Sequence, residues 1–339
     1  MTSEAVAEFL DRFRIPLIAA PMTGVSGLEL AVAAADSGIG ASFPVHNAAS
    51  PAEVDRWLQH LEQRPGLVIP NLVVHRTNAR LAADLDVITA HRVPAVITSV
   101  GSPAHVVGPL HDAGVLVFSD VASLRHVERA IAAGVDGLVL LTAGAGGQTG
   151  WANPFVFIRA VRRIWDGPLV LAGGITDGAG MAGAIVAGCD LVYMGTPFIA
   201  TAESAAHESY KQAVVRASMD DIELTSALTG LPTSMIRADA ANSETYRAAT
   251  GFDVAELGQG DQQQLSIQAQ MFSAGHGVAG VHDIVAVADL IDRVEREFTA
   301  ARTETSGRRT PDGRQPAENA LPQPISHTRS QRVGFVADL

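Results

Sequence analysis

Cysteine is almost absent from this sequence of 339 residues. Cys189 is the only one, so the chain cannot form an internal disulfide framework or a cysteine-based zinc site. A single unpaired thiol is typical of proteins that work in a reducing compartment. We therefore expect the protein to work in a reducing compartment.

Positive charge is also scarce. The chain has 24 lysine and arginine residues against 36 aspartate and glutamate residues, which gives a net charge of -12 and a pI near 5.3. A surface of this sign repels phosphate backbones, so we expect no nucleic-acid partner. The apolar runs are short and interrupted, so we expect no membrane span, and residues 1–13 resemble a short amphipathic helix rather than a signal peptide.

Several motifs that assign a function directly are missing. No two histidines have the H-x-x-x-H or H-E-x-x-H spacing of a helical metal site, and we predict no bound metal. The G-x-S-x-G motif of serine hydrolases and the Walker motif of nucleotide triphosphatases do not occur either. Hydrolysis by these two routes is therefore excluded.

What the sequence does contain is a large apolar fraction arranged in short runs. Hydrophobic residues make up 47% of the chain and charged residues 18%. Eight near-continuous apolar runs alternate with alanine-rich helical segments, as in parallel sheets buried on both faces. This pattern predicts an α/β protein with a (β/α)8 TIM barrel; a doubly wound open sheet is the alternative. The expected strands are 16–20, 39–43, 67–74, 95–100, 115–119, 137–142, 168–172 and 191–194, and the expected helices are 28–37, 52–63, 80–91, 103–113, 124–133, 154–164 and 180–187, with an eighth after Thr196.

Two segments are expected to lie outside the barrel, which we place at residues 14–299. A mixed, polar excursion at about 205–275 is predicted to be a small insertion or lid beside the site, followed by a closing helix at 284–299. Residues 300–339 are rich in polar residues and proline, and we predict a disordered C-terminal tail.

The ends of the predicted strands carry the candidate site, because ligands of such barrels bind at the carboxyl ends of the strands. Gly173 and Gly174 follow the seventh strand, and Gly195 and Thr196 follow the eighth. Backbone N–H groups at these positions, with the Thr196 hydroxyl, are suited to a phosphate dianion. The alternative is that these glycines only form tight turns.

Other strand ends offer groups for a flat ring. Ala20, Pro21 and Met22 end the first strand, and Met22 is polarizable enough to lie beside a ring. Asn71 is a polar side chain in an otherwise apolar strand, and a buried amide needs partners, from either a ligand or the core. Polar residues also end the next two strands, at Ser99 and Asp120.

The sixth strand runs into an unusually glycine-rich stretch, T-A-G-A-G-G-Q-T-G-W, residues 142–151. Glycine allows the backbone to turn sharply and to approach a ligand closely. Trp151 and Phe155, just beyond, are candidates for the wall of a substrate pocket or for the core.

In this order, the motifs resemble those of the nitronate monooxygenases, once called 2-nitropropane dioxygenases. The FMN-dependent enoyl-acyl-carrier-protein reductases share the same layout. The resemblance covers about residues 14–295, and five weak motifs in register are together fairly specific. The motifs are Ala20-Pro21-Met22, Pro70-Asn71, Gly144-Ala145-Gly146-Gly147, Leu171 to Gly178, and Met194-Gly195-Thr196.

The resemblance implies a barrel that binds FMN non-covalently in the cytoplasm, without a metal, and acts on a small molecule with O2. We expect a monomer or a homodimer. Gly173, Gly174, Gly195 and Thr196 would hold the FMN phosphate. The ring and the rest of the cofactor would contact Ala20, Pro21, Met22, Asn71, Ser99, Asp120, Ala145, Gly146 and Gly147.

One position departs from the family pattern A-G-G-H-x-G, whose histidine is the catalytic base or hydrogen-bond donor. This chain has Gln148 there. Glutamine donates and accepts hydrogen bonds but does not take up a proton near pH 7, whereas histidine does. A neutral nitroalkane must lose an α-proton before oxidation, and a nitronate has already lost it. We therefore predict alkyl nitronates as substrates, with Gln148 orienting the nitro group.

A second departure lies in Ser273-Ala274-Gly275-His276-Gly277, where relatives resemble S-A-G-Q-G. One hypothesis is that His276 reaches the site and partly replaces the missing base; the alternative is a surface or capping histidine. His46, after the second strand, is either a substrate contact or a loop residue. Three other functions stay open: an FMN-dependent enoyl or ene reductase that uses NAD(P)H, a specialised biosynthetic flavoenzyme, and a catalytically silent FMN-binding barrel.

Overall fold

A computed structural model describes residues 2–226, 231–237 and 272–307 of the chain. Two compact units are distinguished, Met1–Arg302 and Thr303–Leu339, and the first contains all of the strands. The candidate lid residues 238–271 and the tail residues 308–339 lie outside the described residues.

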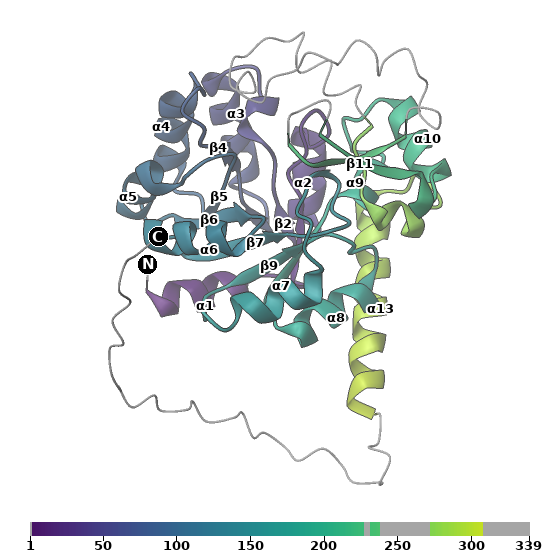
Figure 1. The fold of residues 1–339 in the computed structure, drawn as a ribbon. Coiled ribbons are helices and arrows are strands. Elements are labelled where there is room, and N and C mark those ends of the chain that lie inside the picture. Colours follow the sequence, from purple (N-terminus) through teal and green to yellow (C-terminus); the bar gives the residue numbers. More distant parts are fainter. Residues whose placement is uncertain (1, 227–230, 238–271, 308–339) are drawn as a thin grey trace, which may run out of the picture. The chain divides into compact units, whose positions relative to one another are not determined.

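A parallel sheet forms the centre of the first unit (Figure 1). Within the described residues it has nine strands in the order β3-β2-β1-β10-β9-β7-β6-β5-β4, and every pair of neighbours is parallel. The strands are β1 (Leu17–Ala19), β2 (Gly40–Ala41), β3 (Leu67–Val68), β4 (Asn71–Val73), β5 (Ala95–Ser99), β6 (Leu116–Val121), β7 (Gly137–Leu141), β9 (Leu169–Ala172) and β10 (Leu191–Met194).

The predicted (β/α)8 barrel is confirmed, with its third strand divided in two. The expected strand at 67–74 forms β3 and β4, and Pro70 stands between them with no N–H to donate to a ladder. β3 pairs with β2 on one side and β4 pairs with β5 on the other. Counted as one strand, β3 and β4 close the ring of eight.

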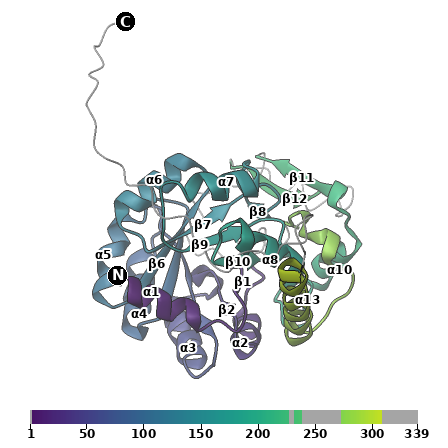
Figure 2. The same cartoon turned by 90° about the horizontal axis from the view of Figure 1, so that it is seen from below.

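Helices surround the sheet, as the view from below shows (Figure 2). Ser50, Ser123, Asn153 and Asp177 cap helix starts, because each side-chain oxygen accepts a backbone N–H of the first turn. The helices of the barrel are α2 (Leu28–Asp36), α3 (Pro51–Leu61), α4 (Leu81–His91), α5 (Ala104–Asp112), α6 (Leu124–Ala133), α7 (Pro154–Val161), α8 (Gly178–Ala187) and α9 (Thr196–Ile199), and α10 (Glu208–Arg216) and α13 (Val287–Gly307) follow. None of the described helices is both long and apolar enough to cross a membrane.

The inside of the barrel is filled with side chains and closed at its amino-terminal end. Helix α1 (Ser3–Asp11) lies across that end (Figures 1 and 2). From this helix Phe9 joins the inner cluster and lies 5.5 Å from the ring of Phe118. Gly137 is required here, because a Cβ at this position would lie 2.2 Å from the Phe118 ring. The amino-terminal part of the barrel interior is therefore a packed core.

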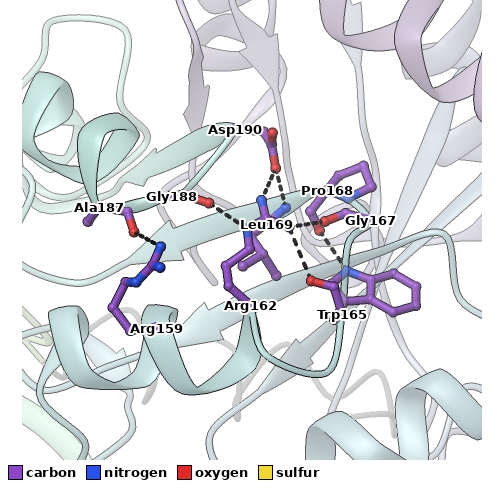
Figure 3. Close-up of polar contacts among 9 residues, drawn as sticks. All are labelled: Arg159, Arg162, Trp165, Gly167, Pro168, Leu169, Ala187, Gly188 and Asp190. Atoms are coloured by element: carbon purple, nitrogen blue, oxygen red, sulfur yellow. Dashed lines mark hydrogen bonds and ion pairs between the residues drawn. The ribbon is translucent and has the colours of Figure 1, made fainter. Parts of the chain in front are cut away.

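A ladder of polar contacts fixes the amino-terminal ends of β9 and β10 (Figure 3). Arg162, just after α7, forms an ion pair with Asp190 at 2.5 Å and donates to the carbonyls of Gly167 and Gly188 at 2.6 and 2.7 Å. The Asp190 carboxylate also accepts the Leu169 N–H at 2.8 Å. One guanidinium thus joins the segments that lead into two neighbouring strands.

A small antiparallel sheet, which the sequence analysis did not predict, joins the excursion to the barrel. It consists of β11 (Ile222–Thr225), β12 (Thr233–Ile236) and β8 (Gly147–Gln148), in the order β11-β12-β8. Since β8 belongs to the glycine-rich stretch, the first part of the excursion is built onto the candidate site itself.

The closing helix is longer than predicted. It begins at Val287 and continues to Gly307, so the disordered tail predicted from residue 300 is wrong for residues 300–307. Contacts of the helix help to explain this: Arg302 lies 5.3 Å above the ring of Phe298, one turn earlier. Composition alone does not show such stabilising pairs along a helix.

Candidate functional site

The alternation of side chains along the strands produces the floor of a cavity. On β6, Leu116 and Phe118 point into the barrel core, and Asp120 is the next residue on that face. On the other strands, too, the residue two positions beyond an inward-facing core residue lies on the same face. Together these residues form one layer above the packed core. That layer lines a cavity of about 280 Å³, and it comprises Ala20, Asn71, Ser99, Asp120, Leu141, Ala172 and Tyr193.

Every residue predicted to contact the cofactor lines this cavity, as does Gln148. The structure therefore brings the predicted residues together at the carboxyl ends of the strands, and their roles stay predictions. Thr23 and Tyr193 also line it and were not predicted, and His46 lines it, as one of its two sequence-based interpretations expected. Tyr193 could have been predicted from the sequence, because it lies two residues beyond Leu191 on the same inward face of β10.

Asn71 and Ser99 form a polar pair in the floor. The Asn71 amide nitrogen lies 3.2 Å from the Ile97 carbonyl oxygen and 3.2 Å from the Ser99 hydroxyl. The core therefore supplies part of what the buried amide needs. The same side chains still face the cavity, so both of the sequence-based interpretations of Asn71 hold in part.

The candidate phosphate-binding residues after β9 and β10 differ in what they contact. A Cβ at Gly173 would lie 2.5 Å from the Thr142 hydroxyl oxygen, so packing alone requires glycine there. Gly174 has a φ of +72° and would place a Cβ in open space at the cavity wall. The Thr196 hydroxyl accepts the Gly275 N–H at 3.1 Å, which leaves its own proton free to donate to a ligand.

The glycines of the 142–151 stretch turn out to serve packing more than ligand approach. A Cβ at Gly146 would lie 2.7 Å from the Gly275 nitrogen, and a Cβ at Gly150 would lie 2.1 Å from the Leu141 oxygen. Gly144 accepts the His276 N–H at 3.0 Å. The loop is thus held against another backbone segment, and Gly147, with a φ of +66° and open space around it, is the glycine that faces the cavity freely.

Gln148 stands at the edge of the cavity on β8. Its backbone pairs with Thr233 of β12, and its side chain is half-buried. Trp151 and Phe155 are 81% and 59% exposed and are not among the described cavity-lining residues. The proposal that they form the pocket wall or the core is therefore wrong, because the chain turns outward after Gly150.

His276 lies behind the loop rather than in the cavity. Its side chain is exposed, and it is not among the described residues that line the cavity. Its imidazole packs against Gly144, where a Cβ would lie 3.0 Å from Nδ1. The structure does not bring His276 together with Gln148 on the cavity wall, which corrects the expectation that it reaches the site.

The cavity has little charge. Among the described lining residues there is no lysine, arginine or glutamate. Burial lowers the pKa of His46 to about 4, helped by the nearby charge of Arg80, so this imidazole is neutral at physiological pH. Its Nε2 lies 3.0 Å from the Thr23 hydroxyl oxygen. No cluster of histidine, cysteine, aspartate and glutamate suited to a metal ion occurs in the part of the chain that the structure describes.

Comparison with known proteins agrees with this geometry. The sequence model of a family described as nitronate monooxygenase matches residues 44–297. A nitronate monooxygenase from Paraburkholderia phytofirmans is 31% identical over 148 residues, 40% of each chain. A (3aS,4S,5R,7aS)-5-hydroxy-7a-methyl-1-oxo-octahydro-1H-indene-4-carboxyl-CoA dehydrogenase from Rhodococcus jostii is 27% identical over 159 residues, 47% of this chain and 45% of that protein. The alignments thus span less than half the length of these two curated relatives.

Among solved structures, a mutant of FabK from Thermotoga maritima superposes with a TM-score of 0.73 at 25% identity. The superposition covers 89% of this chain and 98% of that one.

Proposed function

Because the chain belongs to the nitronate monooxygenase family, we propose that it is a flavin-dependent oxidoreductase that binds FMN and oxidises alkyl nitronates with O2. The observation that carries this proposal is the cavity at the strand ends. It joins the glycine turns after β9 and β10 to the polar floor around Asn71.

The residues present fit a flavin. A flat ring needs a floor of mixed apolar and polar groups, which Ala20, Leu141, Ala172 and the Asn71–Ser99 pair provide. A phosphate needs N–H and O–H donors, and the open backbone at Gly174 and the free proton of Thr196 offer them. When bound, the flavin supplies the redox chemistry, accepting electrons from the substrate and passing them to O2.

Gln148 defines which substrates can react. Its amide stands at the cavity wall, where it can donate a hydrogen bond to a nitro oxygen and hold that group in one orientation. It has no proton-accepting state near pH 7, and His46 is a weak base because burial lowers its pKa to about 4. A substrate that arrives without its α-proton avoids the need for a base. This is the reason for proposing nitronates rather than nitroalkanes.

An FMN-dependent enoyl or ene reductase is the second candidate function, favoured by the likeness to FabK over most of both chains. Such a reaction needs hydride from NAD(P)H and a proton for the α-carbon, and Gln148 does not supply that proton. A specialised biosynthetic flavoenzyme and a silent flavin-binding barrel are the remaining alternatives. A cytoplasmic location, O2 as co-substrate and a monomer or homodimer stay predictions.

The first experiment is an anaerobic flavin spectrum. The purified protein is loaded with FMN, and an alkyl nitronate is added in the absence of oxygen. Bleaching of the flavin absorbance supports the proposal, and its return on admitting O2 supports oxygen as the electron acceptor. An unchanged spectrum with nitronate, together with bleaching by NADH or NADPH and turnover of an enoyl thioester, would replace the proposal by the reductase.

A matched pair of glycine variants tests the phosphate end of the site. Gly174 and Gly114 both have positive φ, +72° and +80°, and a Cβ at either would meet nothing within 4 Å. Gly174→Ala and Gly114→Ala should therefore destabilise the protein similarly, by about 1 kcal/mol. Only the Gly174 variant places a methyl group at the cavity wall, so we expect its FMN affinity to fall at least about tenfold. Fluorescence titration with FMN measures this, and equal affinities for the two variants would contradict it.

A further inference from the structure

Two polar atoms in the cavity floor have no partner. The Asp120 carboxyl has a buried Oδ1, and Tyr193 has a buried hydroxyl; neither atom makes a hydrogen bond within the described residues. Both side chains line the cavity, one at the end of β6 and the other at the end of β10. Burial without a hydrogen-bond partner is unfavourable for such atoms, and native proteins rarely leave them so away from functional sites.

The neighbours of the pair do not satisfy it. Ser99 on β5 and Leu141 on β7 stand beside Asp120 in the same layer, and Ser99 is engaged with Asn71. No cation among the described residues lines the cavity to pair with the carboxylate. The two side chains therefore face the cavity without a hydrogen-bond partner for these atoms among the described residues.

We propose that Asp120 and Tyr193 are a pair of hydrogen-bond donors that hold acceptor atoms of a bound ring, and that Asp120 does so in its protonated form. The ligand class is a flat heteroaromatic ring with carbonyl or imine acceptors at its edge, which the isoalloxazine ring has. This inference rests on the proposed flavin-dependent function and adds the protonation state in which the floor recognises its ligand.

The environment of the carboxyl supports the neutral form. Burial alone raises the pKa of Asp120 to about 7, and burial together with the nearby Asp120 charge raises the pKa of Tyr193, which stays protonated. The other titratable residues on the described wall are His46, neutral above about pH 5, and Tyr210, whose hydroxyl donates to the Ser273 carbonyl. Asp120 is thus the one group there that changes charge between pH 6 and 9.

The sign of the pH dependence follows. Below pH 7 the Asp120 carboxyl is protonated, and its O–H donates a hydrogen bond to an acceptor atom on the ring. Above pH 7 the Asp120 carboxyl of the ligand-free protein is deprotonated. Binding of the ring then requires either that the carboxylate takes up a proton or that it lies against an acceptor atom, which is unfavourable. Ring affinity should therefore fall as pH rises through 7, with a limiting slope of tenfold per pH unit.

The experiment measures the dissociation constants of riboflavin and FMN by fluorescence quenching at pH 6, 7, 8 and 9. Riboflavin is the primary probe, because a phosphate monoester has its own second ionisation near pH 6. The variants are Asp120→Asn, whose amide donates at every pH, and Tyr193→Phe, which removes one donor. Thermal unfolding of each apoprotein confirms that the variants fold.

We expect riboflavin affinity of the wild-type protein to fall at least about tenfold from pH 6 to pH 9. Asp120→Asn should bind with nearly constant affinity over this range, close to the wild-type value at pH 6. Tyr193→Phe should bind several-fold more weakly throughout and keep the wild-type slope. If riboflavin affinity changes with pH equally in the wild type and in Asp120→Asn, the inference is overturned and the proposed function is left intact. If neither riboflavin nor FMN binds at any pH, both the inference and the proposed function are overturned.

Discussion

Replacing Gln148 with histidine is expected to give the protein activity on neutral nitroalkanes. A positioned general base typically accelerates proton abstraction by about 10²- to 10⁴-fold, and a half-exposed histidine titrates near pH 6.5. Position 148 suits the exchange, because its backbone is fixed by β12 while its side chain faces the cavity. The measurement is flavin reduction by a primary nitroalkane at pH 8, followed by stopped-flow absorbance, in the wild type and in Gln148→His.

Three comparisons make this prediction specific. Oxidation of the preformed nitronate should change only a few-fold in Gln148→His, since that substrate needs no base. Gln148→Ala should lower nitronate oxidation without creating nitroalkane activity. His276→Ala should leave both activities unchanged, because its side chain is exposed and outside the cavity lining. Substantial nitroalkane oxidation by the wild-type protein would show that another group acts as the base.

The second large effect concerns stability alone. Arg162→Ala is expected to lower the free energy of unfolding by about 3 kcal/mol. The side chain is 17% exposed, and its removal leaves Asp190 and two backbone carbonyls without their charged partner. Chemical denaturation, followed by far-UV circular dichroism, measures the loss.

Arg159→Ala is the matched control, because Arg159 lies in the last turn of α7, three residues before Arg162, is exposed and donates to the Ala187 carbonyl at 3.2 Å. Its loss should be below about 1 kcal/mol. Both variants should bind FMN like the wild type, since neither arginine is among the described residues of the cavity. A weaker effect for Arg162 than for Arg159 would contradict the role assigned to the Asp190 pair.

The barrel could be predicted because its signals are local. Each apolar run and each capping residue acts within a few positions, and the strand boundaries differ from the prediction by at most a few residues apart from the split at Pro70. The location of the residues predicted to contact the ring could be predicted equally well, because the carboxyl ends of parallel strands must meet at one end of a barrel.

The remaining features depend on contacts between distant segments. Gly146 is glycine because Gly275 passes behind it, and β8 exists because β12 returns to pair with it. Nothing in the 142–151 stretch by itself distinguishes a glycine required by a ligand from one required by another backbone. The sequence could not decide between the two interpretations of His276 for the same reason, since an exchange of two residue types says nothing about where a side chain points.

Phe9 of α1 packs into the amino-terminal end of the barrel, and this has a consequence for how fast ligands exchange. Because the inner cluster packs beneath the cavity, a ligand on its floor cannot leave through the amino-terminal end of the barrel. We therefore expect a molecule bound near Gln148 to slow the departure of a ligand from the floor near Asn71. A high concentration of substrate should accordingly slow exchange of the floor ligand with the solution.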